Sequence, residues 1–266
     1  MSKKKEKELL EQQRRIEAFD SCYRDIFKER WDGLKSKLLE KSNPIAFTKG
    51  LKQPYFMDEA SILVASLLPL NGQEAVLDMC AAPGGKTLVL SSKLTTGTIL
   101  ANDRSRDRKV RLDTVIKEHL SEEKQALIST TNKNAALFGQ TYPDAFDCVL
   151  LDAPCSSERH VLTSEKHLSI WNITRPKRLA IEQFGLLCAA LDAVKIGGYI
   201  LYSTCALIPM EDEQVIKKLL ERREGRVTII PITLTDAEDR EYGKIILPDK
   251  ANGKGPLYAC LLQRIS

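Results

Sequence analysis

The stretch VLDMCAAPGGKT (residues 76–87) joins a short apolar run to a glycine-rich loop. Ligands of open parallel sheets bind beyond the carboxyl ends of the strands, so a binding site is expected at this loop. Its small residues and two glycines let backbone N–H groups come close to a ligand, and a helix that begins near Gly85 places positive partial charge there. Met79 and Cys80 stand where a Walker loop requires its first glycine, which disfavours a nucleoside triphosphate. The alternative is that the turn only packs a helix against a strand.

Outward from this loop, short apolar runs alternate with helical patterns. The runs occupy residues 75–78, 98–102, 126–130, 146–151, 199–203 and 226–231, and the helical patterns occupy residues 85–94, 104–119, 177–194 and 211–222. This βαβ repetition predicts an α/β fold with a Rossmann-like, doubly wound parallel sheet. Residues 244–247 and 256–263 flank a turn that contains glycine and asparagine, which predicts a terminal β-hairpin.

The N-terminal segment has a different pattern. Apolar residues between Leu9 and Leu39 recur at intervals of mostly three and four, as in an amphipathic helix, and Ser42-Asn43-Pro44 ends the pattern. We therefore divide the chain into an N-terminal helical arm, residues 1–44, and a main domain, residues 45–266. Residues 1–41 carry 12 basic and 9 acidic side chains. The arm is either a helical hairpin packed on the core or a basic helical face that reaches a nucleic acid.

Whole-chain composition excludes several classes of protein. The 266 residues have a net charge of +4, so a nucleic acid would have to meet a local basic face. The longest apolar run, residues 61–70, is about half of what a membrane-spanning helix needs, and we expect no membrane contact. Seven scattered cysteines without a C-x-x-C pair predict neither a disulfide framework nor a metal site, and they predict a reducing, cytoplasmic location.

The second apolar run ends in Asn102-Asp103, about 20 residues after the glycines. An acid at that distance can accept hydrogen bonds from both hydroxyls of a ribose. Alone, Asp103 would be interpreted as a solvated helix cap. Together with the glycine-rich loop, it predicts a ligand that contains a nucleoside.

Three motifs follow one another at strand ends: LDMCAAPGGKT (residues 77–87), DAPCS (residues 152–156) and YSTC (residues 202–205). In this order they resemble the signature motifs of the Sun/RsmB/RsmF/NSUN family of RNA cytosine-5 methyltransferases, and the resemblance extends from about residue 49 to the end of the sequence. It implies a class I methyltransferase fold, S-adenosyl-L-methionine as cofactor, and RNA as substrate. The expected partner of this monomeric enzyme is ribosomal RNA or an assembling ribosomal subunit, with transfer RNA as the alternative substrate.

The resemblance also carries over the family's cofactor-binding residues. They correspond to Cys80, Ala81, Ala82, Pro83, Gly84, Gly85, Lys86, Asp103 and Asp152. A further acid is expected 18 positions before Asp152, where this chain has Asn134. An amide can accept and donate a hydrogen bond near an adenine, so Asn134 is kept as a binding residue. Cys80 has a second explanation as a spacer in the loop.

The expected reaction explains why the motifs carry two cysteines and an acid. Carbon 5 of cytosine is not nucleophilic enough to take a methyl group from a sulfonium, but a thiolate that adds to carbon 6 makes it so. The resemblance gives Cys205 this attacking role and Cys155 a role in releasing the product. Asp152 is expected beside nitrogen 3 of the ring. Burial could keep a proton on Asp152 for that nitrogen, or Lys86 could hold Asp152 ionised so that it orients the exocyclic amine.

Other polar residues near these motifs carry further expectations. His160 is close enough to Cys155 in sequence to line an RNA cleft, whereas His119 and His167 have no identifiable partner. The remaining cysteines are expected to be small buried hydrophobes; they are Cys22, Cys148, Cys188 and Cys260. A basic segment after Cys155 is either a solvated loop or a rim that binds RNA phosphates; it contains Arg159, Lys166, Arg175, Lys177 and Arg178.

Two other functions compete with this hypothesis. A DNA cytosine methyltransferase would use Cys155, the cysteine of the Pro-Cys pair, as its nucleophile and would leave Cys205 unexplained. A non-catalytic ribosome-assembly factor could retain the cofactor pocket without needing either cysteine. The presence of both Cys155 and Cys205 favours the RNA methyltransferase.

Overall fold

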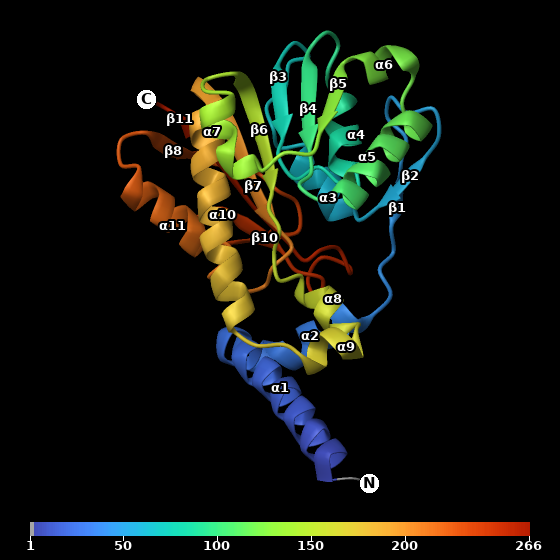
Figure 1. The fold of residues 1–266 in the computed structure, drawn as a ribbon, viewed down its shortest axis with the longest axis vertical. Helices are drawn as coiled ribbons and strands as arrows, with labels where there is room; N and C mark the ends of the chain where they lie inside the picture. Colours follow the sequence, from blue (N-terminus) through green and yellow to red (C-terminus); the bar gives the residue numbers. More distant parts are fainter. Residues whose placement is uncertain (1–2) are drawn as a thin grey trace.

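The computed structural model describes residues 3–266 and, from Glu6 onward, their side chains. Its core is a nine-stranded sheet in the order β5-β4-β3-β6-β7-β11-β10-β9, with β8 paired to β11 (Figure 1). The strands of this sheet are β3 (Ala75–Asp78), β4 (Thr98–Asn102), β5 (Ile128–Thr131), β6 (Phe146–Asp152), β7 (Val194–Thr204), β8 (Val227–Ile230), β9 (Ala237–Asp239), β10 (Lys244–Ile246) and β11 (Leu257–Arg264).

Five neighbouring strands, β5, β4, β3, β6 and β7, run parallel. Leu77 pairs with Leu100 on one side and with Val149 on the other, and most residues of β3 and β6 are buried. Such continuous apolar strands are typical of a sheet that is covered on both faces. β11 lies antiparallel between β7 and β10. The predicted doubly wound sheet and its terminal hairpin, β10 with β11, are confirmed.

Helices cover both faces of the sheet. On one face lie α3 (Glu59–Ala65), α4 (Gly85–Ser91) and α5 (Arg106–His119), and on the other lie α7 (Phe138–Thr141), α10 (Thr174–Ala193) and α11 (Glu213–Arg222) (Figure 1). The core on the first face includes Val64, Leu88 and Leu112, and the core on the second includes Leu187 and Ile216. Burial of these apolar side chains on both faces stabilises the sheet and fixes the carboxyl ends of its parallel strands.

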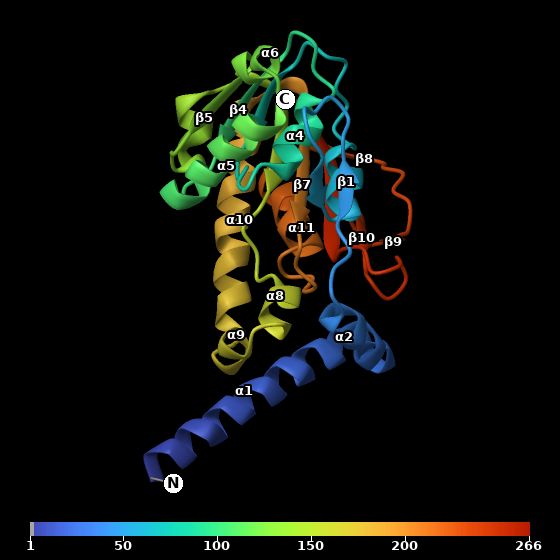
Figure 2. The ribbon, with the colours of Figure 1, turned by 90° about the vertical axis from the view of Figure 1, so that its right-hand side faces the viewer.

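The N-terminal arm consists of α1 (Lys3–Phe27), the 3-10 turn η1 (Lys28–Arg30) and α2 (Trp31–Leu39). Phe19, Tyr23 and Trp31 are fully buried and pack with Trp171, which precedes α10. By contrast, the first half of α1 extends away from the body (Figure 2), and Leu9 is 47% exposed. The hypothesis of a helical hairpin packed on the core is therefore right from Phe19 onward and wrong for the start of α1.

Several elements differ from the sequence prediction. Residues 122–126 form a helix, α6 (Glu122–Ala126), because Ser121 caps it by accepting a hydrogen bond from Lys124 N, so the third strand begins at Ile128 and not at residue 126. The unpredicted elements are β1 (Ile45–Phe47), β2 (Tyr55–Met57), α3, η2 (Ala135–Leu137), α7, α8 (Glu158–Leu162), α9 (Glu165–Ser169) and β9. Each is too short for a periodic pattern. No helix among residues 3–266 is long and apolar enough to cross a bilayer.

Candidate active site

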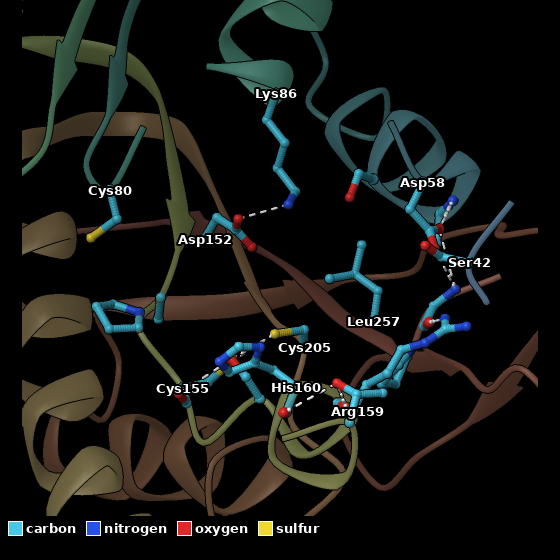
Figure 3. Close-up of a pocket in the computed structure, with 18 of the residues that line it drawn as sticks. Ser42, Asp58, Cys80, Lys86, Asp152, Cys155, Arg159, His160, Cys205 and Leu257 are labelled. Carbon is cyan, nitrogen blue, oxygen red and sulfur yellow. Dashed lines mark hydrogen bonds and ion pairs between the residues drawn. The ribbon is translucent and has the colours of Figure 1, made fainter. Parts of the chain in front are cut away.

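The carboxyl ends of β3, β6 and β7 open into a cavity of about 880 Å³ (Figure 3). The predicted site residues on its wall are Cys80, Lys86, Asp152, Cys155 and Cys205. A smaller cavity of about 240 Å³ has Asp103 and Asn134 on its wall and shares Cys80 and Arg108 with the larger one. The structure therefore brings the predicted residues together in two neighbouring cavities.

The rest of the glycine-rich loop lies outside the walls of these two cavities. The space beside Gly84, whose φ is +121°, is filled by Leu112 and Val115 of α5, and a Cβ on Gly85 would lie 2.9 Å from the Tyr55 ring. These contacts require glycine for packing. The loop residues concerned are Ala81, Ala82, Pro83, Gly84 and Gly85, and their direct role in binding a cofactor stays a prediction.

Gly84→Ala should destabilise the fold. An alanine at this φ is strained, and its Cβ would lie 3.1 Å from side-chain atoms of Leu112 and Val115. We expect the free energy of unfolding to fall by about 1–3 kcal/mol, measured by urea denaturation. Gly185→Ala in α10 is the control, since its Cβ would meet nothing within 4 Å apart from its own stretch of helix and alanine favours a helix by about 1 kcal/mol. Equal stability of Gly84→Ala and the unchanged protein would contradict the packing role.

Asp103 has an unused acceptor at the smaller cavity. Its Oδ1 accepts a hydrogen bond from Ser105 N at 2.9 Å. Its Oδ2 is buried, lies 3.3 Å from the Arg108 guanidinium, and has no hydrogen bond within the described chain. Buried carboxylate oxygens are ordinarily hydrogen-bonded, so this oxygen fits a ligand donor such as a ribose hydroxyl. Asn134 caps η2 on the same wall by accepting from Ala136 N at 3.3 Å.

Two further residues support these walls and were not predicted. Arg108 borders both cavities and donates to the Ala82 carbonyl at 2.5 Å. Asn102 is buried and ties two loops together, because its amide donates to the Met79 carbonyl at 3.0 Å and its oxygen accepts from Lys133 N at 2.9 Å. Sequence offers no signal for Arg108, which is one of several arginines near the start of α5.

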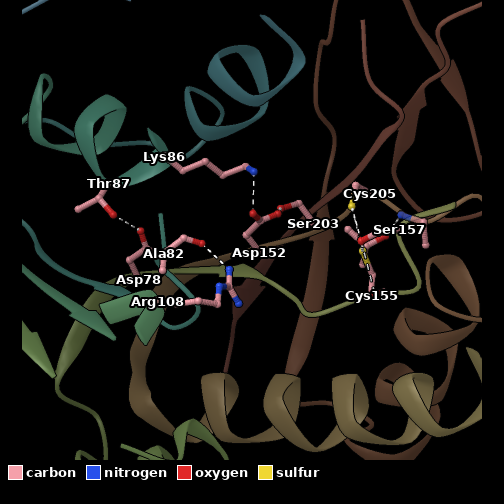
Figure 4. A network of polar contacts seen from close by, with 12 residues as sticks. Asp78, Ala82, Lys86, Thr87, Arg108, Asp152, Cys155, Ser157, Ser203 and Cys205 are labelled. Carbon is pink, nitrogen blue, oxygen red and sulfur yellow. Dashed lines mark hydrogen bonds and ion pairs between the residues drawn. The ribbon is translucent and has the colours of Figure 1, made fainter. Parts of the chain in front are cut away.

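Asp152 forms an ion pair in the larger cavity (Figure 4). Lys86 Nζ lies 2.7 Å from its Oδ2, and Ser203 Oγ donates to its Oδ1 at 2.8 Å. Burial lowers the pKa of Lys86, but the Asp152 carboxylate outweighs this and raises it, so the ammonium stays charged. With a donor on each oxygen, Asp152 acts as an acceptor. This arrangement favours the second of the two sequence hypotheses, an ionised Asp152.

The two motif cysteines are in direct contact. Their Sγ atoms lie 3.0 Å apart as free thiols, and Ser157 Oγ lies 3.2 Å from the Cys205 sulfur (Figure 4). The hydrogen bond from Cys155 lowers the pKa of Cys205 and that from Ser157 adds to this, although burial raises it. The same contact with Cys205, together with burial, raises the pKa of Cys155. Cys205 is therefore the thiol that ionises first.

The sheet explains why these cysteines meet. Asp152 and Ser203 are partners in the parallel β6–β7 ladder, so the loops that follow them leave the sheet side by side. Ser157 then adopts a left-handed conformation with φ +55°, which is uncommon for serine. Strain of this kind persists where the surrounding structure fixes the backbone, and here it occurs where a hydroxyl meets both thiols.

None of the other five cysteines shares the lowered pKa of Cys205. Burial raises the pKa of each of them; they are Cys22, Cys80, Cys148, Cys188 and Cys260. Among all seven cysteines, which lie in the described part of the chain, Cys205 alone has a lowered pKa. The described residues contain no cluster of three or more side chains suited to a metal ion.

The histidines are better connected than expected. His160 lines the larger cavity, and its ring centroid lies 4.8 Å from that of His167. His167 also contacts Ser164 Oγ at 2.8 Å, and His119 contacts the Gln53 carbonyl at 3.1 Å. Sequence identified no partner for His119 or His167 because the residues that they contact lie on loops or short helices without a periodic pattern.

Arg159 ties three segments of the fold together. Its guanidinium donates to the carbonyl oxygens of Gly255 at 2.6 Å, Gly253 at 3.3 Å and Glu40 at 3.1 Å. These bonds tie α8 to the loop before β11 and to the end of the arm. These three bonds use only the two terminal nitrogens of the guanidinium, and Arg159 also lines the larger cavity, so its place in a phosphate-binding rim stays a prediction.

Comparison with known proteins identifies the family. A family model described as 16S rRNA methyltransferase RsmB/F matches residues 65–263 of the 266. The chain belongs to this family. The matched range of this RsmB/F chain includes Cys155, Cys205 and the loops that carry them. The match confirms the resemblance that the three motifs indicated.

Relatives of this RsmB/F chain are named for ribosomal and for transfer RNA. The 5-cytosine rRNA methyltransferase NSUN4 of Bos taurus is 32% identical over 235 residues, which cover 82% of this chain and 61% of the relative. The mitochondrial tRNA (cytosine(34)-C(5))-methyltransferase of Danio rerio is 31% identical over 235 residues, with 82% and 62% covered. The chain thus spans about three fifths of the length of these relatives.

Solved structures share the fold of this RsmB/F chain. PH0851 superposes with a TM-score of 0.80 at 20% identity, covering 92% of this chain and 65% of that one. NSun6 from Pyrococcus horikoshii superposes with a TM-score of 0.66 at 23% identity, covering 83% and 55%. These likenesses confirm the class I methyltransferase fold.

Proposed function

We propose that this protein transfers a methyl group to carbon 5 of a cytosine in RNA, with Cys205 as the attacking thiolate. The observation that carries the proposal is the position of the Cys205 sulfur on the cavity wall, 3.0 Å from the Cys155 sulfur and 3.2 Å from Ser157 Oγ, two contacts that lower the pKa of Cys205. The charged Lys86–Asp152 pair on the same cavity wall and membership of the RsmB/F family support the same reaction.

The residues of the smaller cavity fit S-adenosyl-L-methionine. Asp103 Oδ2, buried and without a hydrogen bond in the described chain, would accept from the ribose hydroxyls, and Asn134 would contact the adenine. Cys80, which borders both cavities, would lie between the cofactor and the cytosine. When bound, this cofactor supplies an electrophilic methyl group on a sulfonium.

The steps on the cytosine use the chain's own side chains. The Cys205 thiolate adds to carbon 6, and the displaced electron pair makes carbon 5 nucleophilic. Asp152, held ionised by Lys86, accepts a hydrogen bond from the exocyclic amine and orients the ring. After methylation a water molecule in the cavity takes the carbon 5 proton, the electron pair of that C–H bond restores the ring double bond, and the bond from carbon 6 to sulfur breaks, which returns Cys205 as a thiolate. Cys155, 3.0 Å from that sulfur, takes part in this release.

RNA is favoured over DNA as the substrate. A DNA-type mechanism would use Cys155 as nucleophile and would leave Cys205, on the same cavity wall, without a role, whereas the family description names an RNA substrate. We infer ribosomal RNA, or an assembling ribosomal subunit, because the family description and the NSUN4 relative name ribosomal RNA. Transfer RNA is the second candidate, since the Danio rerio relative is named for it.

Bisulfite sequencing of ribosomal and transfer RNA, from cells with and without the protein, tests this substrate choice. We expect one ribosomal cytosine to lose its protection from conversion in cells without the protein. Loss of protection in a transfer RNA alone would support the second candidate. Identical conversion in both RNA classes would contradict the proposed activity.

We further infer a monomer that works in a reducing compartment such as the cytoplasm. One chain contains both cysteines and both cavities, so the proposed reaction needs no second copy. Free thiols at Cys155 and Cys205, 3.0 Å apart, favour a compartment that keeps them reduced.

Two arginines near the larger cavity fit RNA phosphates. Arg175 and Arg178 lie one turn apart at the start of α10 and border a third cavity, of about 430 Å³, together with His167. His167 contacts His160 of the larger cavity, so the two cavities adjoin at the histidine pair. Neither guanidinium forms an ion pair or hydrogen bond with another described side chain. An RNA strand that crosses the histidine pair would meet both charges.

Replacing both arginines, Arg175→Glu with Arg178→Glu, should weaken RNA binding by about tenfold or more at low salt, because phosphate contacts dominate affinity. The slope of log affinity against log salt concentration should become shallower by about 2. Cofactor affinity should not change. Arg222→Glu, exposed at the end of α11, is the matched control. Titration of labelled RNA measures the RNA affinity of all variants. An unchanged affinity of the double variant would contradict the proposed contact between these arginines and RNA phosphates.

A further inference from the structure

We propose that Glu158 positions both active-site cysteines and that Tyr23 of the N-terminal arm holds Glu158 in place. The catalytic consequence rests on the proposed function, whereas the contacts do not. Glu158 is the first residue of α8 and is fully buried. Its carboxylate accepts hydrogen bonds from three separate segments of the chain, which makes it the point where the arm meets the two cysteine loops.

One carboxylate oxygen joins the arm to the Cys155 loop. Glu158 Oε1 accepts from Tyr23 Oη at 2.5 Å and from Ser156 Oγ at 2.5 Å. Ser156 follows Cys155 directly. The other oxygen, Oε2, accepts from Leu207 N at 3.1 Å, two residues after Cys205. Glu158 therefore bridges the backbones that carry both thiols.

The separation of these loops controls the reactivity of Cys205. Its sulfur accepts from Cys155 at 3.0 Å and from Ser157 at 3.2 Å, and Ser157 immediately precedes Glu158. Sites of this kind must hold their geometry to within about 0.5 Å, so a small shift of the Cys155 loop would weaken both hydrogen bonds. Glu158 touches neither sulfur, and its negative charge by itself raises the pKa of Cys205. A loss of Cys205 reactivity in a Glu158 variant would therefore come through the loops, so Glu158 is a positioning residue.

Tyr23 is the donor that the arm supplies. Its ring is fully buried and stacks on Trp31 with centroids 5.2 Å apart, while Phe19 lies 4.5 Å away. A buried carboxylate is costly unless donors satisfy it. Burial raises the pKa of Glu158, and the hydrogen bonds from Ser156 and Tyr23 oppose that rise. The aromatic packing of the arm therefore fixes a hydroxyl that the active site uses.

The Cys155 loop has a second support on the opposite side. Glu211 Oε2 accepts from Ser156 N at 2.9 Å and from Gln183 Nε2 at 2.8 Å, and Gln183 also donates to the Pro154 carbonyl at 2.8 Å. A variant at Tyr23 or Glu158 should therefore stay folded, while the position of the Cys155 loop becomes less fixed.

The test measures alkylation of Cys205 by iodoacetamide in the full chain without RNA, followed by mass spectrometry of the Cys205 peptide. Tyr23→Phe, which removes only the hydroxyl, should slow alkylation near neutral pH by about tenfold and move its pH profile to higher pH. Turnover on RNA should fall by a similar factor at unchanged KM. Tyr258→Phe is the control, since it removes another buried tyrosine hydroxyl, which donates to the Tyr242 carbonyl and contacts neither cysteine loop.

A double variant separates positioning from general destabilisation. If Tyr23 acts through Glu158, then Tyr23→Phe with Glu158→Gln should be as slow as Glu158→Gln alone. Alkylation at the unchanged rate in folded Tyr23→Phe would overturn the proposal. So would a double variant whose alkylation rate falls by the product of the two single-variant factors. If Glu158→Gln does not fold, the rate and pH profile of Tyr23→Phe decide alone. A protein that methylates no RNA would refute the proposed function, and the alkylation rates would still decide the role of Glu158.

Discussion

Cys205→Ala should neither methylate RNA nor form a covalent adduct with it, and its rate should fall by on the order of a thousandfold or more. The reason is chemical, because the variant lacks the thiolate that adds to carbon 6 and makes carbon 5 nucleophilic, and Cys155, the other thiol on the cavity wall, serves the release of the product. The Cys205 sulfur is also the one whose pKa is lowered, by the hydrogen bonds from Cys155 and Ser157. Labelled RNA on a denaturing gel and methyl transfer from labelled cofactor measure the two losses separately.

Cys155→Ala should behave differently. It retains the attacking sulfur, so it should still carry the reaction as far as methyl transfer, although more slowly because Cys205 loses the contact that lowers its pKa. It should then accumulate a protein–RNA conjugate that survives denaturing electrophoresis. Cys188→Ala is the control, because Cys188 is half-buried on α10 and lies outside the walls of both cavities. A conjugate formed by Cys205→Ala and absent in Cys155→Ala would exchange the two roles and support a DNA-type mechanism. Unchanged activity in both variants would refute the catalytic proposal.

Asp103→Asn should weaken binding of S-adenosyl-L-methionine by between about tenfold and a hundredfold, since a hydrogen bond to a charged group contributes roughly 1.5–3 kcal/mol. Asparagine can keep the 2.9 Å hydrogen bond from Ser105 N to Oδ1. Oδ2, however, is replaced by an amide NH2 group, which cannot accept a hydrogen bond from a ribose hydroxyl. Calorimetry measures the affinity directly, without turnover.

The control for this variant is Asp107→Asn, an acid in the first turn of α5. It should bind the cofactor as the unchanged protein does, because Asp107 is outside the walls of both cavities. An Asp103→Asn variant of unchanged affinity would remove the ribose assignment. It would leave the buried Oδ2 to the Arg108 guanidinium alone, 3.3 Å away.

Sequence predicts the parts of this site that the sheet itself assembles. Lys86 and Asp152 are 66 residues apart, yet both follow parallel strands, and the carboxyl ends of such strands meet at one edge. The same rule brings Cys155 to Cys205. A motif and a strand pattern were sufficient there because the register of the ladder leaves little choice of position.

The other contacts of the site depend on how side chains pack, and no periodic pattern in the sequence predicts them. Tyr23 and Glu158 are 135 residues apart, and their contact depends on where the aromatic residues of α1 settle on the body. The charge of Arg159 was visible in the sequence, whereas the three carbonyl groups that it contacts were not. Gly84 likewise has two roles. The sequence shows its place in a turn, but it does not show its close contact with α5.

The position of β11 has a consequence for biosynthesis. It is the last strand in chain order, yet it lies inside the sheet, with β7 on one edge and β8 and β10 on the other. A ribosome adds about 5–20 residues per second, so the 52 residues between β7 and β11 take between about 3 and 10 seconds to appear. During that interval the edge of β7 from Tyr199 to Thr204 has no partner, and an open edge of this kind pairs readily with other chains. Chaperone protection of the nascent chain should therefore matter most in the seconds between the synthesis of β7 and that of β11.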